Sequence, residues 1–190
     1  MKRNIVAMVL VLFCSTAGWA TNITNGGFEN GNFTGWTLGG VCPGSDPAGS
    51  PCWSAVVTSP VHAGVYSGKF GAYPGSMTLT QSVTVPAGSY TLSFWLALTT
   101  GNPLDNSFDV SWGGASVGSF SDLSAATWAQ RSFLINSTGA ATPLVFTMAQ
   151  DITGDFFLDD ISVDLVPEPA TLWLMGLGLA CVGLTRRKKA

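Results

Sequence analysis

The sequence is poor in charged residues, and His62 is its only histidine. Six of its eight Lys and Arg residues lie at the two ends. Between residues 21 and 165 only Lys69 and Arg131 oppose Glu29 and nine aspartates, so this segment has a net charge of −8. A segment this acidic is repelled by phosphate backbones. The charge balance therefore argues against binding to nucleic acid.

Residues 21–165 also lack any long stretch in which apolar residues recur with helical spacing. They contain short runs rich in Val, Thr, Phe, Trp and Tyr, separated by Gly, Pro, Asn and Ser, which is typical of strands and turns. About eight strands at this spacing predict an all-β antiparallel sandwich of the jelly-roll type, formed as one domain. The predicted strands are Trp53–Thr58, Lys69–Ala72, Ser76–Val85, Tyr90–Leu98, Ser107–Trp112, Trp128–Ile135, Leu144–Met148 and Phe156–Leu165.

One pair of neighbouring strands is predicted to form a hairpin. Apolar and polar residues alternate from Met77 to Val85, as in an antiparallel strand with one buried face. The turn sequence Pro86–Ser89 then leads into the run Tyr90–Leu96. We therefore expect these two runs to pair with each other.

Cysteine is scarce in the same segment, where only Cys42 and Cys52 occur. They flank a loop rich in Pro and Gly, and in an exported protein the expected state of such a pair is a disulfide. A metal-binding pair is the less favoured alternative, since no His or further Cys lies nearby in the sequence.

The two ends of the chain indicate export. Lys2 and Arg3 precede a short apolar run and then small residues up to Ala20, the pattern of a cleaved signal peptide over residues 1–20. At the other end, residues 166–190 contain an apolar stretch, residues 170–185, that predicts a transmembrane helix. The basic cluster that follows should remain cytoplasmic, which places the domain outside the inner membrane.

The order of features in this tail resembles the PEP-CTERM sorting signal. Pro167, Glu168 and Pro169 come first, then the short apolar segment, and then the cluster Arg186, Arg187, Lys188 and Lys189. The resemblance implies that an exosortase, a membrane transpeptidase, processes the chain at or near Pro-Glu-Pro. It also implies a Gram-negative bacterium that makes extracellular polysaccharide. An ordinary tail anchor is the alternative interpretation.

The two ends of the domain resemble jelly-roll carbohydrate-binding modules and the related galactose-binding-like domains. The segments that carry this resemblance are Asn25–Gly31 with Trp36, and Phe157–Val163. The resemblance implies that the first and last strands lie side by side and that a structural calcium ion joins the termini. Glu29 would be one carboxylate ligand, and hard oxygen ligands of this kind suit calcium. Asp159 is the preferred second ligand because it shares parity with Ile161 and Val163, whereas Asp160 should face solvent.

Catalytic motifs are weak. Gly114–Gly118 matches G-x-S-x-G, but the nucleophile elbow requires a following helix and a histidine base. No helical pattern follows, Trp112-Gly113-Gly114 is better interpreted as a hairpin turn, and His62 as an ordinary loop residue. Asp159 and Asp160 cannot be a glycosidase pair in a strand, because neighbouring side chains point to opposite faces. We assign no catalytic residue and predict that the protein is not an enzyme; a carboxylate pair from separate loops, such as Asp105 with Asp151, remains the open alternative.

Aromatic residues offer a route to sugar binding, since sugars stack on exposed rings. Trp36, Trp95 and Trp128 are expected in the core. Trp53, Tyr66 and Tyr73 are the candidate exposed platforms. The resulting hypothesis is an exported surface or matrix protein that associates with extracellular polysaccharide. A structural matrix or adhesion protein without a defined ligand is the alternative.

Overall fold

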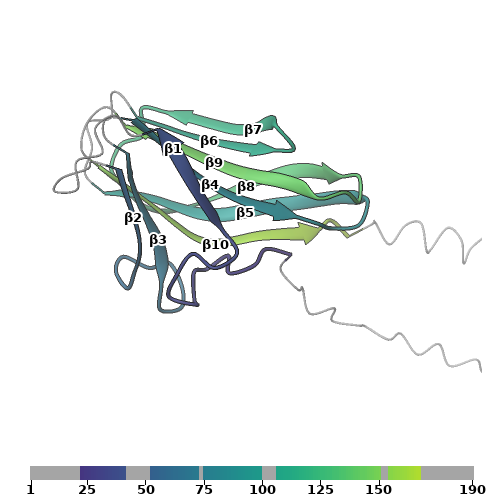
Figure 1. Ribbon diagram of the computed structural model, residues 1–190, viewed down its shortest axis with the longest axis horizontal. Helices are drawn as coiled ribbons and strands as arrows, with labels where there is room; N and C mark the ends of the chain where they lie inside the picture. Colours follow the sequence, from purple (N-terminus) through teal and green to yellow (C-terminus); the bar gives the residue numbers. More distant parts are fainter. Residues whose placement is uncertain (1–21, 42–51, 73–74, 100–105, 151–153, 168–190) are drawn as a thin grey trace, which may run out of the picture.

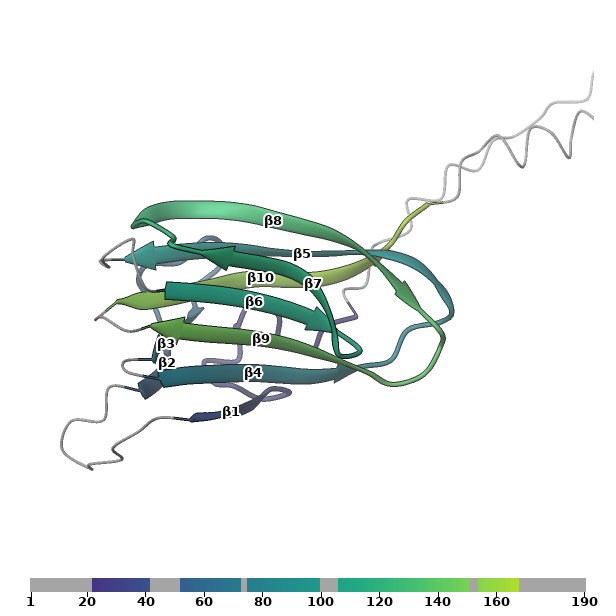
Figure 2. The ribbon, with the colours of Figure 1, turned by 90° about the horizontal axis from the view of Figure 1, so that it is seen from above.

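The computed structural model describes residues 22–41, 52–72, 75–99, 106–150 and 154–167. In these residues ten strands form two five-stranded antiparallel sheets that pack face to face, as Figures 1 and 2 show. The all-β sandwich predicted from the sequence is confirmed.

The first sheet has the spatial order β1-β4-β9-β6-β7. Its strands are β1 (Thr37–Val41), β4 (Gly75–Val83), β9 (Thr142–Gln150), β6 (Asn106–Trp112) and β7 (Ala115–Ser121).

The second sheet has the order β2-β3-β10-β5-β8. Its strands are β2 (Cys52–Val57), β3 (Ser67–Ala72), β10 (Asp155–Leu165), β5 (Gly88–Thr99) and β8 (Ala126–Ser137).

Alternation along the strands produces the core. In β9 every second residue from Leu144 to Gln150 is buried, and β4 and β6 show the same period. The inward side chains of both sheets meet in a cluster rich in phenylalanine, where Phe94 and Phe146 form an edge-to-face pair with centroids 5.2 Å apart. The fully buried rings are Phe28, Phe70, Phe94, Phe108, Phe146 and Phe156.

All eight predicted strands are present, but the sequence analysis missed β1 and β7. β1 contains Gly39 and Gly40, and most residues of β7 are exposed and small. Both are edge strands, so neither needs the alternating apolar pattern that marks a strand buried on one face.

The predicted hairpin between the runs Met77–Val85 and Tyr90–Leu96 is wrong. β4 pairs with β1 and β9, whereas β5 pairs with β8 and β10 in the other sheet. The connection at residues 84–87 therefore crosses from one sheet to the other. A local turn sequence cannot distinguish such a crossing from a hairpin, because partner choice depends on the whole core.

The turn predicted at Trp112-Gly113-Gly114 is confirmed. It joins β6 to β7 in an antiparallel hairpin, with both glycines at positive φ. Ser116 lies on β7, so a strand rather than a helix follows the turn. This geometry is incompatible with a nucleophile elbow.

The first and last strands do not lie side by side as the resemblance implied, because β1 pairs with β4. Instead the segment that precedes β1 runs along β10. The Ile161 amide donates to the Gly26 carbonyl at 3.0 Å, and Asn22 Nδ2 donates to the Val163 carbonyl at 2.9 Å. The two ends of the domain are thus adjacent, but without a ladder between strands.

Several predictions fall outside the described residues. These are the signal peptide, the side chains of Cys42 and Cys52, Tyr73, the Asp105 and Asp151 alternative, and the tail from residue 168 onward. Among the described residues, no helix has both the length and the apolar character needed to span a membrane.

Candidate functional site

A β-bulge in β10 determines how the acidic residues are placed. The register of β10 against β5 shifts between Asp159 and Ser162, and Asp160 within the bulge has a φ of 48°. Core residues are Phe156 and Leu158 before the bulge but Ile161 and Val163 after it. The extra residue therefore reverses which side chains face the core.

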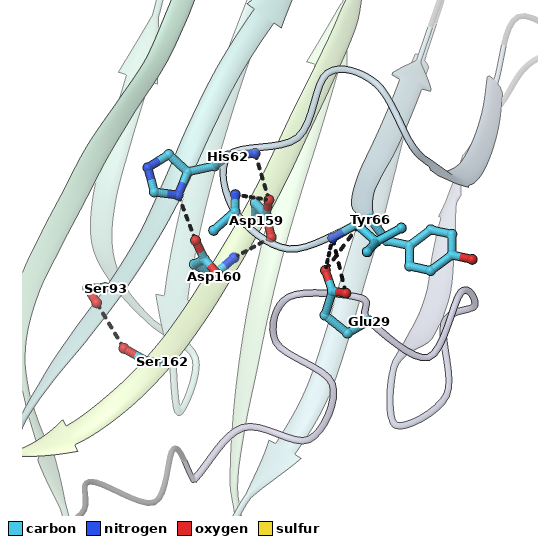
Figure 3. A network of polar contacts seen from close by, with 9 residues as sticks. Glu29, His62, Tyr66, Ser93, Asp159, Asp160 and Ser162 are labelled. Atoms are coloured by element: carbon cyan, nitrogen blue, oxygen red, sulfur yellow. Dashed lines mark hydrogen bonds and ion pairs between the residues drawn. The ribbon is translucent and has the colours of Figure 1, made fainter.

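This reversal corrects the prediction for Asp159. The Asp159 side chain lies on the same face of β10 as Phe157, opposite the core residue Leu158. It therefore faces away from the core and does not share a face with Ile161. It is nevertheless fully buried. The loop between β2 and β3 covers it, as Figure 3 shows.

The Asp159 carboxylate holds that loop by accepting backbone hydrogen bonds. Oδ2 accepts from the His62 amide at 2.9 Å and from the Ala63 amide at 3.3 Å, and Oδ1 accepts from the Asp160 amide at 2.8 Å. Burial raises the pKa of Asp159, and the neighbouring Asp160 charge adds to that rise against the lowering effect of the three amides.

His62 is more than an ordinary loop residue. Its Nδ1 lies 2.6 Å from Asp160 Oδ2, and its ring stacks on Trp95 with centroids 3.7 Å apart and planes inclined by 15°. Trp128 approaches the same imidazole edge-on at 6.0 Å.

Asp159 and Asp160 both contact His62. The rule that neighbouring strand residues face opposite sides therefore fails at the bulge.

The predicted core positions of Trp95 and Trp128 are wrong, whereas Trp36 is buried as expected. Trp95 and Trp128 are half-buried on the outer face of the second sheet. The sequence could have indicated this position. Trp95 lies two and four residues after Ser93 and Thr91, so all three side chains point to the outer face of the sheet. The apolar neighbours Phe94 and Leu96 obscured it.

A groove of about 380 Å³ lies beside Trp95 on this outer face. It is bounded by three strands of the second sheet and by the segment that carries Gly26. Its lining combines one aromatic ring with hydroxyl, amide and carboxylate groups. The residues are Gly26, Gly27, Ser93, Trp95, Gln130, Asp160, Ile161, Ser162 and Asp164.

The polar groups in the groove are already ordered. Ser93 Oγ and Ser162 Oγ lie 2.9 Å apart, and Ser162 Oγ donates to Asp164 Oδ2 at 2.7 Å. This chain fixes hydroxyl and carboxylate positions along the groove. Prearranged polar groups around an aromatic face are the usual means of orienting a small polar ligand.

A second, more apolar hollow of about 460 Å³ is bounded in part by Pro60, Ala97 and Trp128. Trp95 lines the first hollow and Trp128 the second, and both rings contact His62. His62 therefore contacts one aromatic ring from the lining of each hollow.

Glu29 joins the opening segment to the same loop. Its Oε1 accepts from the Val65 amide and the Tyr66 amide, each at 3.0 Å, and Oε2 lies 3.2 Å from the Val65 amide (Figure 3). The Glu29 carboxylate therefore accepts hydrogen bonds from backbone N–H groups of the loop between β2 and β3.

The carboxylates predicted to bind calcium contact protein groups in the structure. Nowhere in the ranges that the structure describes do three His, Cys, Asp or Glu side chains gather closely enough to hold a metal ion. Glu29 and Asp159 accept N–H groups instead, and Asp160 is paired with His62. The calcium ion stays a prediction, and no step below depends on it.

The three predicted platforms differ in position. Trp53 is 39% exposed, and Lys69 Nζ lies 3.9 Å above its ring centroid. Tyr66 packs against the core beside Gly31. Tyr73 lies outside the described residues. Among the described residues, Trp53 is therefore the more open of these platforms, but it lies apart from the polar groove.

The comparisons with known proteins concern the tail and the sandwich separately. Residues 165–188 match the PEP-CTERM protein-sorting motif. The tail is a PEP-CTERM sorting signal. This confirms the resemblance drawn from Pro167, Glu168, Pro169 and the terminal basic cluster. No curated protein sequence matches the chain significantly.

The sandwich is similar to solved carbohydrate-binding modules. The structure of TmCBM61 in complex with β-1,4-galactotriose is 23% identical, with a TM-score of 0.56, and the match covers 77% of this chain and 99% of that one. A "Family 16 Carbohydrate Binding Module-2" is 19% identical, with a TM-score of 0.53, over 75% of this chain and 98% of the module.

An adhesin domain shares the same architecture. The K3 cleaved adhesin domain of Lys-gingipain from Porphyromonas gingivalis is 17% identical, with a TM-score of 0.54, over 77% of this chain and 98% of that domain. At these identities the matches establish the jelly-roll fold of the sandwich.

Proposed function

We propose that this PEP-CTERM protein is exported, anchored transiently in the inner membrane and processed by an exosortase. It then resides at the cell surface or in the matrix. There its β-sandwich binds extracellular polysaccharide without catalysing a reaction. The sorting motif at residues 165–188 supports the first part, and the fold shared with carbohydrate-binding modules supports the second.

One observation carries the binding proposal. Trp95 borders a groove that also presents Ser93, Gln130 and Asp164. A sugar has an apolar C–H face and a rim of hydroxyl groups, so a partly exposed ring beside hydroxyl, amide and carboxylate groups matches both. His62 covers part of Trp95 and fixes its orientation.

Affinity electrophoresis of the exported chain in polysaccharide from a producing strain tests the proposal. We expect retardation, and we expect Trp95→Ala to weaken binding by more than about tenfold, because a central aromatic anchor is removed. Leu38→Ala is the matched control, since Leu38 is 39% exposed on β1 of the other sheet. Equal retardation of Trp95→Ala and Leu38→Ala would reject the Trp95 groove.

Trp53→Ala separates this groove from the platform favoured by the sequence. Loss of binding in Trp53→Ala but not in Trp95→Ala would move the site to β2 and β3. If the unaltered chain shows no retardation in any polysaccharide, the binding proposal fails while the sorting motif is unaffected.

The alternative is a structural matrix or adhesion protein without a defined ligand. Leu134 and Leu165 are 70% and 52% exposed, and large exposed apolar side chains favour association. Light scattering distinguishes the two functions: self-association that does not depend on polysaccharide supports the alternative, and a strict monomer contradicts it.

A further inference from the structure

The groove beside Trp95 is acidic, and only one oxygen of each of its two carboxylates accepts a hydrogen bond or ion pair from the described residues. Asp164 Oδ2 accepts from Ser162, and Asp160 Oδ2 is paired with His62. Among the described residues, the other oxygen of each carboxylate has no hydrogen-bond partner. Both residues line the groove, so two acceptor atoms remain for a ligand.

Neither Lys69 nor Arg131 is available to balance these carboxylates, and the His62 imidazole contacts Asp160 alone of the two. Lys69 pairs with Asp155 at 3.0 Å and lies over Trp53. The Arg131 guanidinium lies 4.7 Å from the centroid of Phe120, and Arg131 pairs in register with the core residue Phe94. The charged groups of Lys69 and Arg131 therefore make their contacts outside the groove.

These charges determine which glycans the groove can accept. A uronate would place its carboxylate beside Asp160 and Asp164 with no lysine or arginine to offset the repulsion, and the −8 charge of residues 21–165 adds to it. An ammonium group would instead be attracted by the groove, because it donates hydrogen bonds to carboxylates and is attracted to the face of a tryptophan ring. Trp95 and the two aspartates lie around one groove.

We infer that the groove recognises a glycan that carries free amino groups, such as a polymer with deacetylated hexosamine residues. This inference rests on the proposed function and specifies its ligand class. Asp164 forms the main ion pair with the sugar ammonium, and Ser93 and Ser162 hold Asp164 in place. Trp95 stacks on the C–H face of a sugar ring.

Calorimetric titration of the full exported chain tests the inference, in a detergent without a sugar headgroup. The probes are β-linked glucosamine oligomers, N-acetylglucosamine oligomers of equal length and oligogalacturonate. The first two share a backbone and differ in the charge on nitrogen. We expect glucosamine oligomers to bind about fivefold more tightly than their acetylated counterparts, the ratio that one partly exposed ion pair supplies, and oligogalacturonate not to bind.

The variant Asp164→Asn should lower the ratio of glucosamine to N-acetylglucosamine oligomer affinity to less than about twofold. Asp109→Asn is the matched control, because it removes the same charge from β6 in the other sheet. Asp160→Asn is a second variant, in case Asp164→Asn fails to fold. Equal losses in Asp164→Asn and Asp109→Asn would show a nonspecific charge effect and overturn the inference.

The outcomes separate the inference from the proposed function. Binding of acetylated oligomers or oligogalacturonate as tight as that of glucosamine oligomers overturns the amine preference but leaves glycan binding intact. If none of the probes binds while the producing strain's polysaccharide does, the ligand class is wrong and the function stands. If neither binds, both fail.

Discussion

The His62 ring lies flat on the Trp95 ring, with centroids 3.7 Å apart, and its Nδ1 contacts Asp160 at 2.6 Å. The loop between β2 and β3 supplies His62, β5 supplies Trp95 and β10 supplies Asp160. This one side chain therefore joins a loop to two strands of the second sheet.

We expect His62→Ala to lower the free energy of unfolding by about 1 kcal/mol, the usual value of a stacked aromatic pair. His62→Phe keeps the stacking on Trp95 and removes the contact with Asp160, so its loss should be smaller. Urea unfolding followed by circular dichroism measures both. Equal losses in the two variants would show that the Asp160 contact, rather than stacking, holds the loop.

Glu29 offers a test that separates hydrogen bonding from metal binding. Glu29→Ala removes the acceptor of the Val65 and Tyr66 amides and should cost about 1 kcal/mol, a modest value because the site is exposed. Glu29→Gln keeps one acceptor oxygen and should retain part of this stability.

Thermal melts with calcium and with chelator then decide the metal prediction. A lower Tm in chelator that disappears in Glu29→Ala would support the calcium ion. Identical melts of the unaltered chain in both buffers would remove it and leave the amide hydrogen bonds as the function of Glu29.

Two neighbouring glycines form a matched pair for the contact between the domain ends. A Cβ at Gly26 would overlap the Ile161 carbonyl oxygen, whereas a Cβ at Gly27 would lie 3.5 Å from the nearest oxygens of Asp159 and Asp160, an ordinary contact. We expect Gly26→Ala to cost about 1–3 kcal/mol and Gly27→Ala to be nearly neutral. Chemical denaturation measures both, and similar stabilities would show that the opening segment does not run along β10 as described.

Asp159 should make stability depend on pH in a definite direction. Its pKa in the folded chain is raised above the ordinary value of 3.8, mainly by burial. The folded state therefore binds the proton more tightly, and the contribution of Asp159 is fully present below the unfolded pKa and is lost as pH rises through the folded one.

The test compares the unaltered chain with Asp159→Asn from acidic to neutral pH. Asn lacks one of the two acceptor oxygens, so the variant should be less stable throughout, by about 1–3 kcal/mol at acidic pH. The stability difference between the two chains should shrink as pH increases. A difference that grows with pH would mean that the amides of His62 and Ala63 outweigh burial and lower the pKa of Asp159.

The sequence by itself determined the sorting tail, the fold class and most of the strands. Pro167, Glu168, Pro169 and the terminal cations form a contiguous signal, and alternation along a run such as Met77–Val83 is a local consequence of strand geometry. These features can be identified without knowing any partner strand.

Only the tertiary structure decided which strands pair and which residues meet. β4 and β5 follow one another in sequence but lie in different sheets, because burial of both inner faces outweighs a local turn signal. The bulge at Asp160 reverses the parity on which the position of Asp159 was predicted. His62, Trp95 and Asp160 come from three separate elements, so their contact depends on long-range packing that no local pattern encodes.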